Sequence, residues 1–358
     1  MLKTTSSATN EYGLSSSASS PALLAGAAWP AVPGGELVTA TSPTCPACAK
    51  PATHSAIERY GKYELFVCPS CDLQFWEPRV MPGSRWYEQM YGGRDETLMP
   101  LEPGHEYFLS DSRAPRRGEL LDIGCGTGNF LAAARDAGYS VTGTELDRNA
   151  ARFAKERLAL PRILGLTIAE FAQRYADEKF EVVTFFEVLE HQAAPLEFLQ
   201  YVKACLRPRG YIALSVPNRQ RWLTGPDVLD YPPNHFLRWN AGALRAFLNA
   251  SGFEILSTRE QPAGVAHTAQ MLNMRLRTGL SRAAGADASP SFRDVMQMAP
   301  AEADSVLHAA PTSRQRALQL LARVKHAACF PVAVAVYPYV RMRHLKGTYL
   351  YCLARLAP

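Results

Sequence analysis

The sequence predicts an α/β protein in which a doubly wound, parallel sheet is preceded by a small cysteine-containing module. Two observations support this prediction. From residue 119 onward, short apolar runs alternate with helical patterns, which is the rhythm of strands and crossover helices. Ahead of that region, four of the eight cysteines form two C-x-x-C pairs separated by 19 residues. With 358 residues, of which 47% are hydrophobic, the chain can build one large core and a small accessory module.

The stretch from Asp122 to Gly128, which reads DIGCGTG, ends the first apolar run. Its glycines stand at every second position, and the helical pattern of residues 129–137 begins directly after them. The glycines therefore lie at a strand-to-helix turn, where free backbone N–H groups face a ligand. The dinucleotide fingerprint G-x-G-x-x-G is not met, because Asn129 takes its last glycine position. We expect a nucleotide-type cofactor other than a nicotinamide dinucleotide, with an ordinary glycine-rich turn as the alternative.

The remaining strands and helices follow from the hydrophobic pattern. Apolar runs predict strands at residues 119–123, 140–146, 162–168, 180–186, 210–216 and 253–258. Helical patterns fall between them at residues 147–159, 195–206 and 241–250. In such a sheet a ligand lies beyond the carboxyl ends of the strands. Polar residues at those ends are therefore the candidates for a functional site.

Acidic residues follow the second and third predicted strands. Glu145 lies 17 residues after Gly128, where a carboxylate can accept hydrogen bonds from both hydroxyls of a ribose. Asp147 is the alternative for this role, although it is better placed to cap the next helix. Glu170 lies either near an adenine amino group or on an exposed helical surface.

Polar residues also end the fourth predicted strand. The segment FFEVLEH, residues 185–191, brings Glu187, Glu190 and His191 to the edge of the sheet. For Glu190 and His191, a hydrogen-bonding role at a helix start or in a loop is the alternative to a role in the site.

The cysteine pairs predict a metal site. Cys45 and Cys48 form one C-x-x-C turn, and Cys68 and Cys71 form the other. Two such turns can supply four thiolates to a tetrahedral Zn²⁺, and the 19 residues between them leave room for a hairpin. Four sulfurs close the coordination sphere, so we expect a structural zinc ribbon rather than a catalytic metal. Thiol redox chemistry is the competing interpretation.

Five segments carry a family resemblance: ELLDIGCGTGNF, VTGTELD, FEVVTFFEVLEH, LRPRGYIALSVPN and GFEIL. In order and spacing they resemble the class I S-adenosylmethionine-dependent methyltransferases, over roughly residues 100–260. The resemblance implies a seven-stranded, Rossmann-like sheet whose antiparallel last strand is Gly347–Ala354. It also implies S-adenosylmethionine held at its methionine end by Asp122, Gly124, Gly126 and Gly128, at its ribose by Glu145, and bordered by Phe186 and Glu187. The cysteine ribbon resembles that of bacterial small-molecule methyltransferases, and the core is also similar to ubiquinone-pathway O-methyltransferases.

Methyl transfer from a sulfonium requires in-line positioning, exclusion of water and, for many acceptors, removal of one proton. The candidate catalytic bases are His191 and His235. His235 lies in DYPPNHFLRW, where Pro232 and Pro233 stiffen a loop able to bring the imidazole over the site. Anchoring of this loop through a backbone carbonyl is the alternative role for His235.

The C-terminal third is basic. Residues 262–358 contain 12 Lys or Arg and 4 Asp or Glu, a local charge of +8 that leaves −3 for the rest of the chain. Within a predicted insertion at residues 261–346, an amphipathic run at 314–328 predicts contact with an anionic acceptor or peripheral contact with a membrane, with a solvated helix face as the alternative. No apolar run reaches the roughly 18 to 20 residues of a spanning helix, and the N-terminus lacks a secretory pattern, so we expect a cytoplasmic protein.

The predicted organisation is a disordered tail at 1–41, a zinc ribbon at 42–80, a connecting or lid segment at 81–118, a methyltransferase core at 119–260, a helical insertion at 261–346 and the last core strand at 347–358. The favoured function is methylation of a small molecule such as a sugar, quinone or secondary metabolite. One alternative is an RNA methyltransferase that holds RNA with its ribbon, but the ribbon carries few positive charges, so nucleic acid is not an expected partner. The other is a non-catalytic zinc-binding interaction protein. The sequence predicts no oligomeric state.

Overall fold

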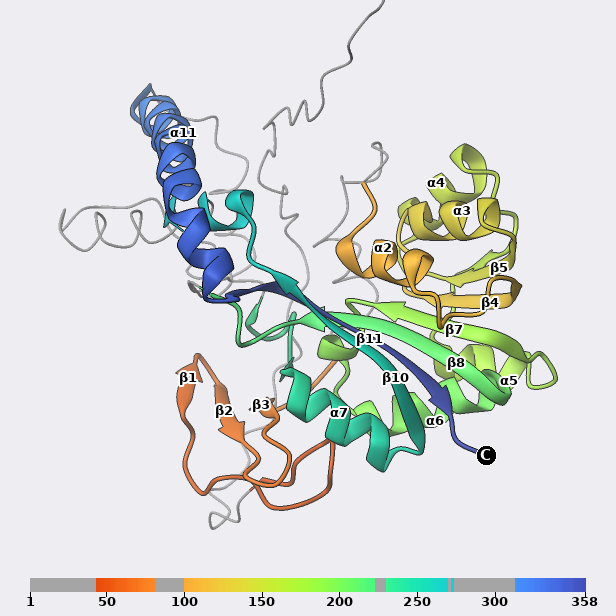
Figure 1. Cartoon of the computed structure of the whole chain (residues 1–358). Helices are drawn as coiled ribbons and strands as arrows, with labels where there is room; N and C mark the ends of the chain where they lie inside the picture. The colour runs from red at the N-terminus through yellow and green to blue at the C-terminus, as the bar shows by residue number, and fades with distance from the viewer. Residues whose placement is uncertain (1–42, 82–99, 223–229, 270–271, 274–312) are drawn as a thin grey trace, which may run out of the picture.

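The computed structural model describes residues 43–81, 100–222, 230–269, 272–273 and 313–358, with only the backbone described for 313–327. The predicted tail at 1–41 and most of the predicted connecting segment, residues 82–99, lie outside these ranges. Within them, the chain forms a seven-stranded sheet and a four-stranded sheet (Figure 1).

The seven-stranded sheet has the order β10-β11-β8-β7-β4-β5-β6. Its strands are β4 (Gly118–Ile123), β5 (Tyr139–Thr144), β6 (Ile163–Leu164), β7 (Phe180–Phe186), β8 (Leu206–Pro217), β10 (Phe253–Pro262) and β11 (Lys346–Leu356). β4 pairs in parallel with β5 and β7, and β7 pairs in parallel with β8, whereas β11 runs antiparallel between β8 and β10. The predicted fold class, with its antiparallel last strand, is therefore confirmed.

Helices cover both faces of this sheet, because successive residues of a strand point to opposite sides. Leu120 and Val182 share one apolar cluster with residues of α2 (Pro103–Ser110), α3 (Asn129–Asp136) and α4 (Arg148–Arg157). Leu121 and Val183 share the other with residues of α5 (Ile168–Arg174), α6 (Pro195–Cys205) and α7 (Ala241–Ala250) (Figure 1). Strands buried on both faces read as continuous apolar runs, which is why the sequence revealed them.

The third predicted strand is shorter than expected. β6 covers Ile163–Leu164 rather than residues 162–168, because Thr167 caps the start of α5. The Thr167 hydroxyl oxygen accepts the N–H of Glu170 at 3.2 Å, and a Glu170 carboxylate oxygen accepts the N–H of Thr167 at 2.8 Å. This reciprocal capping box gives Glu170 a structural role on an exposed helix start.

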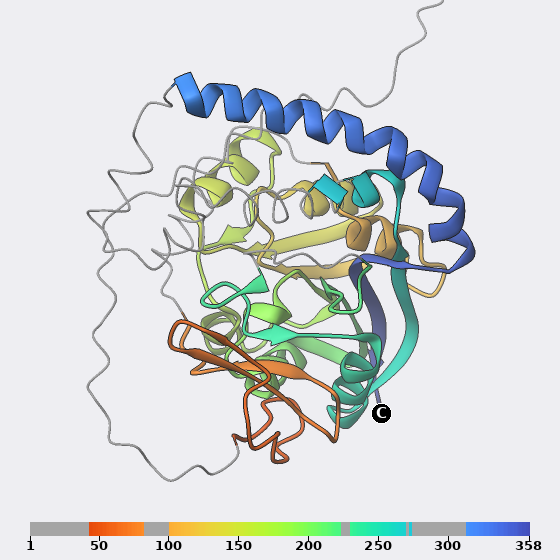
Figure 2. The same ribbon diagram turned by 90° about the vertical axis from the view of Figure 1, so that its left-hand side faces the viewer.

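The four-stranded sheet joins the cysteine module to a distant part of the chain. Its order is β1 (Glu58–Tyr60), β2 (Tyr63–Val67), β3 (Gln74–Glu77) and β9 (Leu237–Arg238), with every pair antiparallel. β9 belongs to the segment between β8 and α7, so the module is completed by the main domain (Figure 2). The N–H of Trp76 also donates to the carbonyl of Phe236 at 2.9 Å.

The module and one face of the main domain share a single apolar core. Leu65, Phe75 and Trp76 of the module lie in the same buried cluster as Trp239 and Phe247. Their side chains are no more than 1% exposed. The module therefore packs as part of the main body, and its position is fixed by buried apolar contacts as well as by strand pairing.

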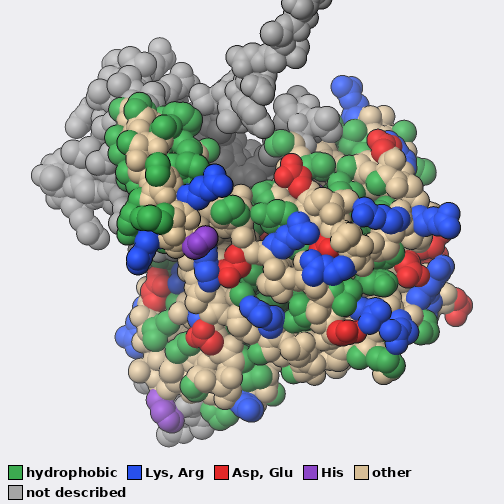
Figure 3. Space-filling view, in the orientation of Figure 1, with side chains coloured by type: hydrophobic (Ala, Val, Ile, Leu, Met, Phe, Trp, Pro, Cys, Tyr) green, Lys and Arg blue, Asp and Glu red, His purple; other side chains and the backbone are tan. Residues whose placement is uncertain are grey.

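The C-terminal part contains α11 (Ser313–Met342), a helix of 30 residues that encloses Pro331 and Pro338. The predicted amphipathic run at 314–328 falls on its first half, where the side chains of residues 313–327 lie outside the described residues. Hydrophobic side chains gather over α11 in Figure 3, and Phe330, Val334 and Met342 are more than half exposed. No helix in the described ranges is long and apolar enough to cross a membrane.

Gly143 of β5 provides a test of this packing. A Cβ atom there would lie 2.7 Å from Cys125 Sγ and from Leu131 Cδ1, and 2.8 Å from Ile163 Cδ1. Overpacking of this kind costs roughly 1–3 kcal/mol, so Gly143→Ala is expected to lower the free energy of unfolding by about that amount in a urea titration. Gly264→Ala is the control, since nothing lies within 4 Å of its Cβ position. Equal stability of the two variants would contradict the close packing of β5 against α3.

Candidate functional site

The glycine-rich turn between β4 and α3 adopts a left-handed backbone at all three glycines. The φ angles of Gly124, Gly126 and Gly128 are 71°, 54° and 83°. A Cβ atom at Gly124 would lie 2.9 Å from Val188 Cγ2, and one at Gly128 would lie 2.7 Å from Leu160 Cδ1. At Gly126 no atom lies within 4 Å of the Cβ position. The outer glycines therefore pack against neighbouring elements, and the middle one faces open space.

Glu145 connects the end of β5 to this turn. One of its carboxylate oxygens accepts the N–H of Gly126 and the other accepts the N–H of Asp147, each at 2.8 Å. Asp147 in turn accepts the N–H of Asn149 at 2.8 Å and is the N-cap of α4. Glu145 thus lies against the glycines, and its role as the ribose ligand stays a prediction, while Asp147 has the capping role that was its alternative.

Asp122 is buried at the end of β4, with a side chain that is 3% exposed. Its carboxyl oxygen accepts the Thr184 hydroxyl at 2.6 Å. Burial raises the pKa of Asp122 to about 8, and the nearby charge of Glu145 adds to the rise. A positively charged ligand group beside Asp122 would favour its ionised form.

Phe186 and Glu187 end β7 next to α2. The Phe186 ring makes edge-on contacts with the rings of His105 and Phe130, at centroid distances of 4.7 and 4.9 Å. Glu187 has a left-handed backbone (φ 53°), and its carboxyl accepts the Ser215 hydroxyl at 2.7 Å. Burial first, and then the charge of Glu102, raise the pKa of Glu187 to about 8.

The residues described so far lie at the carboxyl ends of β4, β5 and β7, on one edge of a sheet with the order expected for the resembling family. Residues 101–258 match the family model described as a methyltransferase domain. The chain contains a class I, S-adenosylmethionine-dependent methyltransferase domain.

Several proteins similar to this chain are named as methyltransferases. A ubiquinone biosynthesis O-methyltransferase of Histophilus somni is 34% identical over 122 residues, which are 32% of this chain and 51% of the relative. A Mycolicibacterium smegmatis protein named as an S-adenosylmethionine-dependent methyltransferase is 29% identical over 161 residues, 45% of this chain and 60% of the relative. A solved methyltransferase structure from Archaeoglobus fulgidus, 15% identical, has a TM-score of 0.40 over 70% of this chain and 88% of that chain. The chain thus spans about half the length of the first of these relatives.

Two predicted catalytic residues meet beside the methyltransferase sheet, together with a carboxyl group. His191 and Glu190 belong to the short 3-10 helix η1 (Leu189–His191), and the His191 ring contacts the His235 ring at a centroid distance of 4.7 Å. One carboxyl oxygen of Glu190 lies 3.8 Å from Nε2 of each histidine. Glu190, His191 and His235, here called the Glu190 cluster, were predicted individually, but their meeting depends on the tertiary fold.

The Glu190 cluster is deeply buried. Glu190 is 0% exposed, and the side chains of His191 and His235 are 13% and 11% exposed. Burial lowers the pKa of His191 to about 3, with the neighbouring His235 adding to the effect, and burial raises the pKa of Glu190 well above its usual range. Glu190 and His191 therefore favour their neutral forms when nothing else compensates the charge.

The cysteine module holds the loop that carries His235. The Tyr231 hydroxyl donates to one carboxylate oxygen of Glu58 at 2.6 Å, and Arg238 donates to the other at 2.8 Å. On the opposite side, the N–H of Phe236 donates to the carbonyl of Glu190 at 2.9 Å. The loop is therefore fixed between β1 of the module and η1 of the methyltransferase domain.

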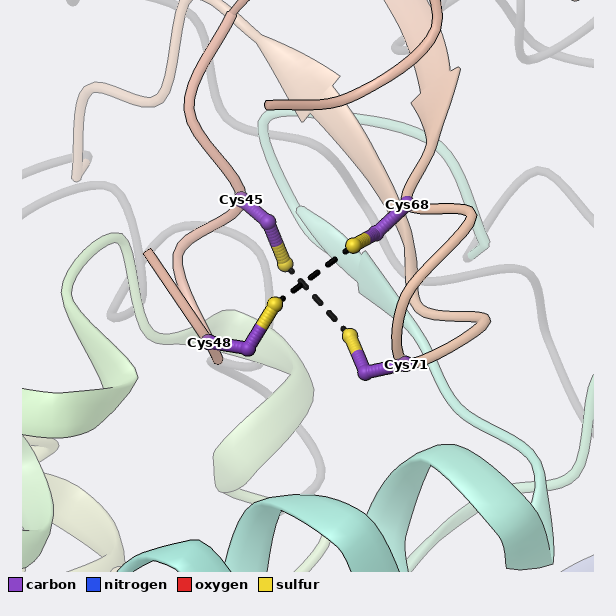
Figure 4. A group of neighbouring side chains, drawn as sticks. All are labelled: Cys45, Cys48, Cys68 and Cys71. Atoms are coloured by element: carbon purple, nitrogen blue, oxygen red, sulfur yellow. Dashed lines mark hydrogen bonds between the residues drawn. The ribbon is translucent and has the colours of Figure 1, made fainter. Parts of the chain in front are cut away.

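The four predicted zinc ligands converge from two turns of the module (Figure 4). Cys45 Sγ lies 3.6 Å from Cys71 Sγ, Cys48 Sγ lies 3.5 Å from Cys68 Sγ, and all four sulfurs lie within 4.8 Å of one another. Sulfurs bound to one tetrahedral zinc at about 2.3 Å stand about 3.8 Å apart, so the arrangement fits the ion. Burial also raises the pKa of Cys45 to about 11, which means that a thiolate here needs a cation.

The sequence interpretation missed the contribution of α2. Glu102 and His105 form a capping box at its start, in which the His105 ring nitrogen accepts the N–H of Glu102 at 3.1 Å. The His105 ring also stacks on Phe130 of α3, with the ring centroids 5.0 Å apart. A histidine two residues after proline, at the N3 position of a helix, was the sequence signal that could have indicated this box.

The capped histidine predicts a pH dependence of stability. Burial lowers the pKa of His105 to about 4, so the folded state resists its protonation and stability falls as the pH drops from about 6.5 to 4. His105→Gln keeps an acceptor for the cap and removes the titration. Relative to this variant, the free energy of unfolding of the wild type should fall by up to about 3 kcal/mol over that interval, as measured by urea unfolding at several pH values.

Exposed His54→Gln is the control for this experiment, and it should follow the wild-type profile. A constant stability difference between wild type and His105→Gln from pH 7 to pH 4 would show that His105 is not buried in its neutral form.

Proposed function

We propose that this protein transfers a methyl group from S-adenosylmethionine to a small-molecule acceptor. The observation that carries the proposal is the contact between Glu145 and the Gly126 N–H, which brings the predicted ribose ligand against the predicted methionine-end turn. This contact lies within the residues that match the methyltransferase domain. When bound, the cofactor supplies an electrophilic methyl group on a sulfonium.

Several described residues support the cofactor assignment. Each carboxylate oxygen of Glu145 accepts one N–H and retains a further lone pair for a ribose hydroxyl. Asp122, which is buried and has a raised pKa, is the group that would form an ion pair with the ammonium of the methionine end. The open space at Gly126 leaves room for a ligand against the backbone, and Phe186 and Glu187 border the same edge.

For the acceptor, we favour a small molecule with a hydroxyl or other ionisable group. Relatives named for ubiquinone biosynthesis are O-methyltransferases, and this supports a quinone-like or phenolic acceptor. His191 and His235 stay our predicted groups for positioning or deprotonating the acceptor, because His191 lies four residues after Glu187 and its ring contacts the ring of His235.

The RNA alternative has less support from the module. Of its positive side chains, Arg59 pairs with Glu64 at 2.8 Å and Lys62 lies 5.3 Å from the centre of the Tyr63 ring. Thin positive charge gives little attraction for phosphates. The remaining alternative is a non-catalytic zinc-binding interaction protein, and it would require that the domain no longer binds the cofactor.

The four cysteines are proposed to bind one structural Zn²⁺. The ion would hold the two turns of the module together and complete the coordination sphere with sulfur, which leaves no position for substrate. Through β3 and β9 it would also stabilise the loop of His235.

Peripheral membrane contact is proposed for the C-terminal helix alone. Phe330 and Met342 are exposed on α11, and the exposed Arg341 and Arg343 lie on either side of Met342 in the sequence. No Asp or Glu occurs from residue 305 to the C-terminus. Exposed apolar and basic side chains together favour an anionic lipid surface or an anionic acceptor.

The cofactor assignment predicts pH-dependent binding. Asp122 is largely protonated below pH 8, and the cofactor ammonium favours its carboxylate, so binding releases a proton and affinity should rise with pH up to about 8. Asp122→Asn should bind S-adenosylmethionine roughly 10- to 100-fold more weakly, with a flatter pH profile, in isothermal titration calorimetry. Exposed Asp136→Asn should match the wild type. Unchanged affinity of Asp122→Asn would rule out the ammonium contact.

The zinc assignment predicts that the cysteine module loses its metal and part of its stability when one ligand is removed. Cys45→Ser should release zinc and lower the thermal unfolding midpoint by about 5 °C or more, since a buried site with three ligands no longer holds the two turns. Metal content and calorimetry report the two effects. Cys205→Ala, a buried cysteine of α6 outside the group, should retain its zinc. A Cys45→Ser protein with the metal content of Cys205→Ala would contradict the assignment.

A further inference from the structure

The Glu190 cluster contains a carboxyl group that the protein does not satisfy. Neither carboxyl oxygen of Glu190 has a hydrogen-bond partner within the described part of the chain, although the side chain is 0% exposed. A buried carboxyl left without partners is strongly unfavourable, and such groups in native proteins signal a missing ligand or ion. The unsatisfied group therefore points to something that the protein alone does not provide.

The two imidazoles lie beside this carboxyl group. His191 Nδ1 lies 2.6 Å from the Asn234 carbonyl oxygen, and because a carbonyl only accepts, Nδ1 carries the hydrogen. The other ring nitrogen, Nε2, lies 3.8 Å from Glu190 Oε1, and the Glu187 backbone carbonyl also contacts the ring. At His235, Nδ1 lies 3.6 Å from Asp230 Oδ1 and Nε2 lies 3.8 Å from Glu190 Oε1.

The surroundings of the cluster are rich in negative charge. Glu187 and Glu102 lie close enough to Glu190 to interact with it electrostatically. Arg221, a cation that interacts electrostatically with Glu187, is paired with Asp230. Several acceptor atoms therefore face one small space with little positive charge to balance them, which favours a bound cation.

We propose that Glu190, His191 and His235 bind a divalent transition-metal cation. Two imidazoles and one carboxylate are a donor set typical of Zn²⁺, Fe²⁺ and Mn²⁺, and they leave coordination positions open. All three donor atoms lie within 4.8 Å of one another. Donors bound to one ion at about 2.1 Å stand about 3.0–3.5 Å apart, so the donor pairs have to approach one another by up to about 1.5 Å.

The contacts behind the histidines are those that a metal site needs. A metal-bound histidine commonly donates its other ring N–H to a carbonyl or carboxylate, which fixes the ring. The Asn234 carbonyl has this position at His191. At His235 the Asp230 carboxylate lies 3.6 Å from Nδ1, and Asp230 is itself held by Arg221. The orientation of the His191 ring is thus set before any ion binds.

This ion is separate from the proposed zinc of the cysteine module, since no donor is shared. The two sites are nevertheless joined through one residue. The N–H of Phe236 donates to the Glu190 carbonyl at 2.9 Å, and its carbonyl accepts the N–H of Trp76 at 2.9 Å. The cysteine module therefore supports the cluster at the position next to His235.

The role of the ion rests on the proposed function, although its binding does not. An acceptor hydroxyl that takes an open coordination position would lose its proton to water more readily, because a cation stabilises the oxyanion. In that case both Nε2 atoms serve as ligands, and the two histidines position the acceptor through the ion instead of removing its proton directly.

Metal titration of the full chain tests the proposal. Mn²⁺ is the first probe, because it prefers oxygen and imidazole donors to thiolates and leaves the cysteine site aside. Free Mn²⁺ is counted by electron paramagnetic resonance, and bound Zn²⁺ is counted by elemental analysis after dialysis. We expect one equivalent of Mn²⁺, or one equivalent of Zn²⁺ beyond that held by the cysteines. Glu190→Gln and His235→Asn should each weaken this binding at least about tenfold.

Exposed His54→Asn is the control and should bind as the wild type does. Circular dichroism and the zinc retained by the cysteines establish that each variant is folded. The proposal is overturned if the wild type takes up no such equivalent of either metal, or if folded Glu190→Gln and His235→Asn bind it with wild-type affinity.

Calorimetry with S-adenosylmethionine separates this proposal from the proposed function. A chain that binds the cofactor but takes up no metal at the cluster would refute the metal site alone. A chain that takes up the metal but fails to bind the cofactor would refute the methyltransferase function and leave the metal site standing.

Discussion

The pairing of β3 with β9 is the contact on which the arrangement of the candidate site depends. It joins residues 74–75 to residues 237–238, and the loop between β8 and α7 is thereby held against the cysteine module. Hydrogen bonds to Glu58 and to the Glu190 carbonyl hold the same loop on its two sides. Because β9 pairs with two residues only, the buried contacts of Trp76 and Trp239 must supply most of the stability of the junction.

This constraint gives the small cysteine module a role beside the methyltransferase domain. The proposed zinc ion would stabilise a short sheet that is too small to fold on its own core. The sheet then provides an edge that holds the loop of His235. Glu58 of the module also holds this loop, because its two carboxylate oxygens accept hydrogen bonds from Tyr231 and Arg238 on either side of His235. The module thus contributes to the geometry of the site while supplying no side chain to the Glu190 cluster.

Buried carboxyl groups set the electrostatics of the same edge. Asp122 and Glu187 have their pKa values raised to about 8, and both follow or end buried strands. Such groups are poorly solvated, so they respond strongly to any cation placed beside them. This environment would favour the proposed cofactor ammonium beside Asp122 and the proposed metal ion at Glu190. One physical cause, the low dielectric at the carboxyl ends of the strands, therefore accounts for both the cofactor site and the proposed metal site.

The sequence by itself determined the features that depend on local spacing. Alternating apolar runs, the glycines of DIGCGTG and the two C-x-x-C pairs fixed the fold class, the strand-to-helix turn and the cysteine cluster, because each needs only neighbours along the chain. Only the tertiary structure decided that β9 completes the cysteine sheet, that α2 packs on Phe186, and that His191 and His235 meet at Glu190. Those contacts join segments tens to hundreds of residues apart, and they are selected by shared burial, which leaves no periodic signal in the sequence.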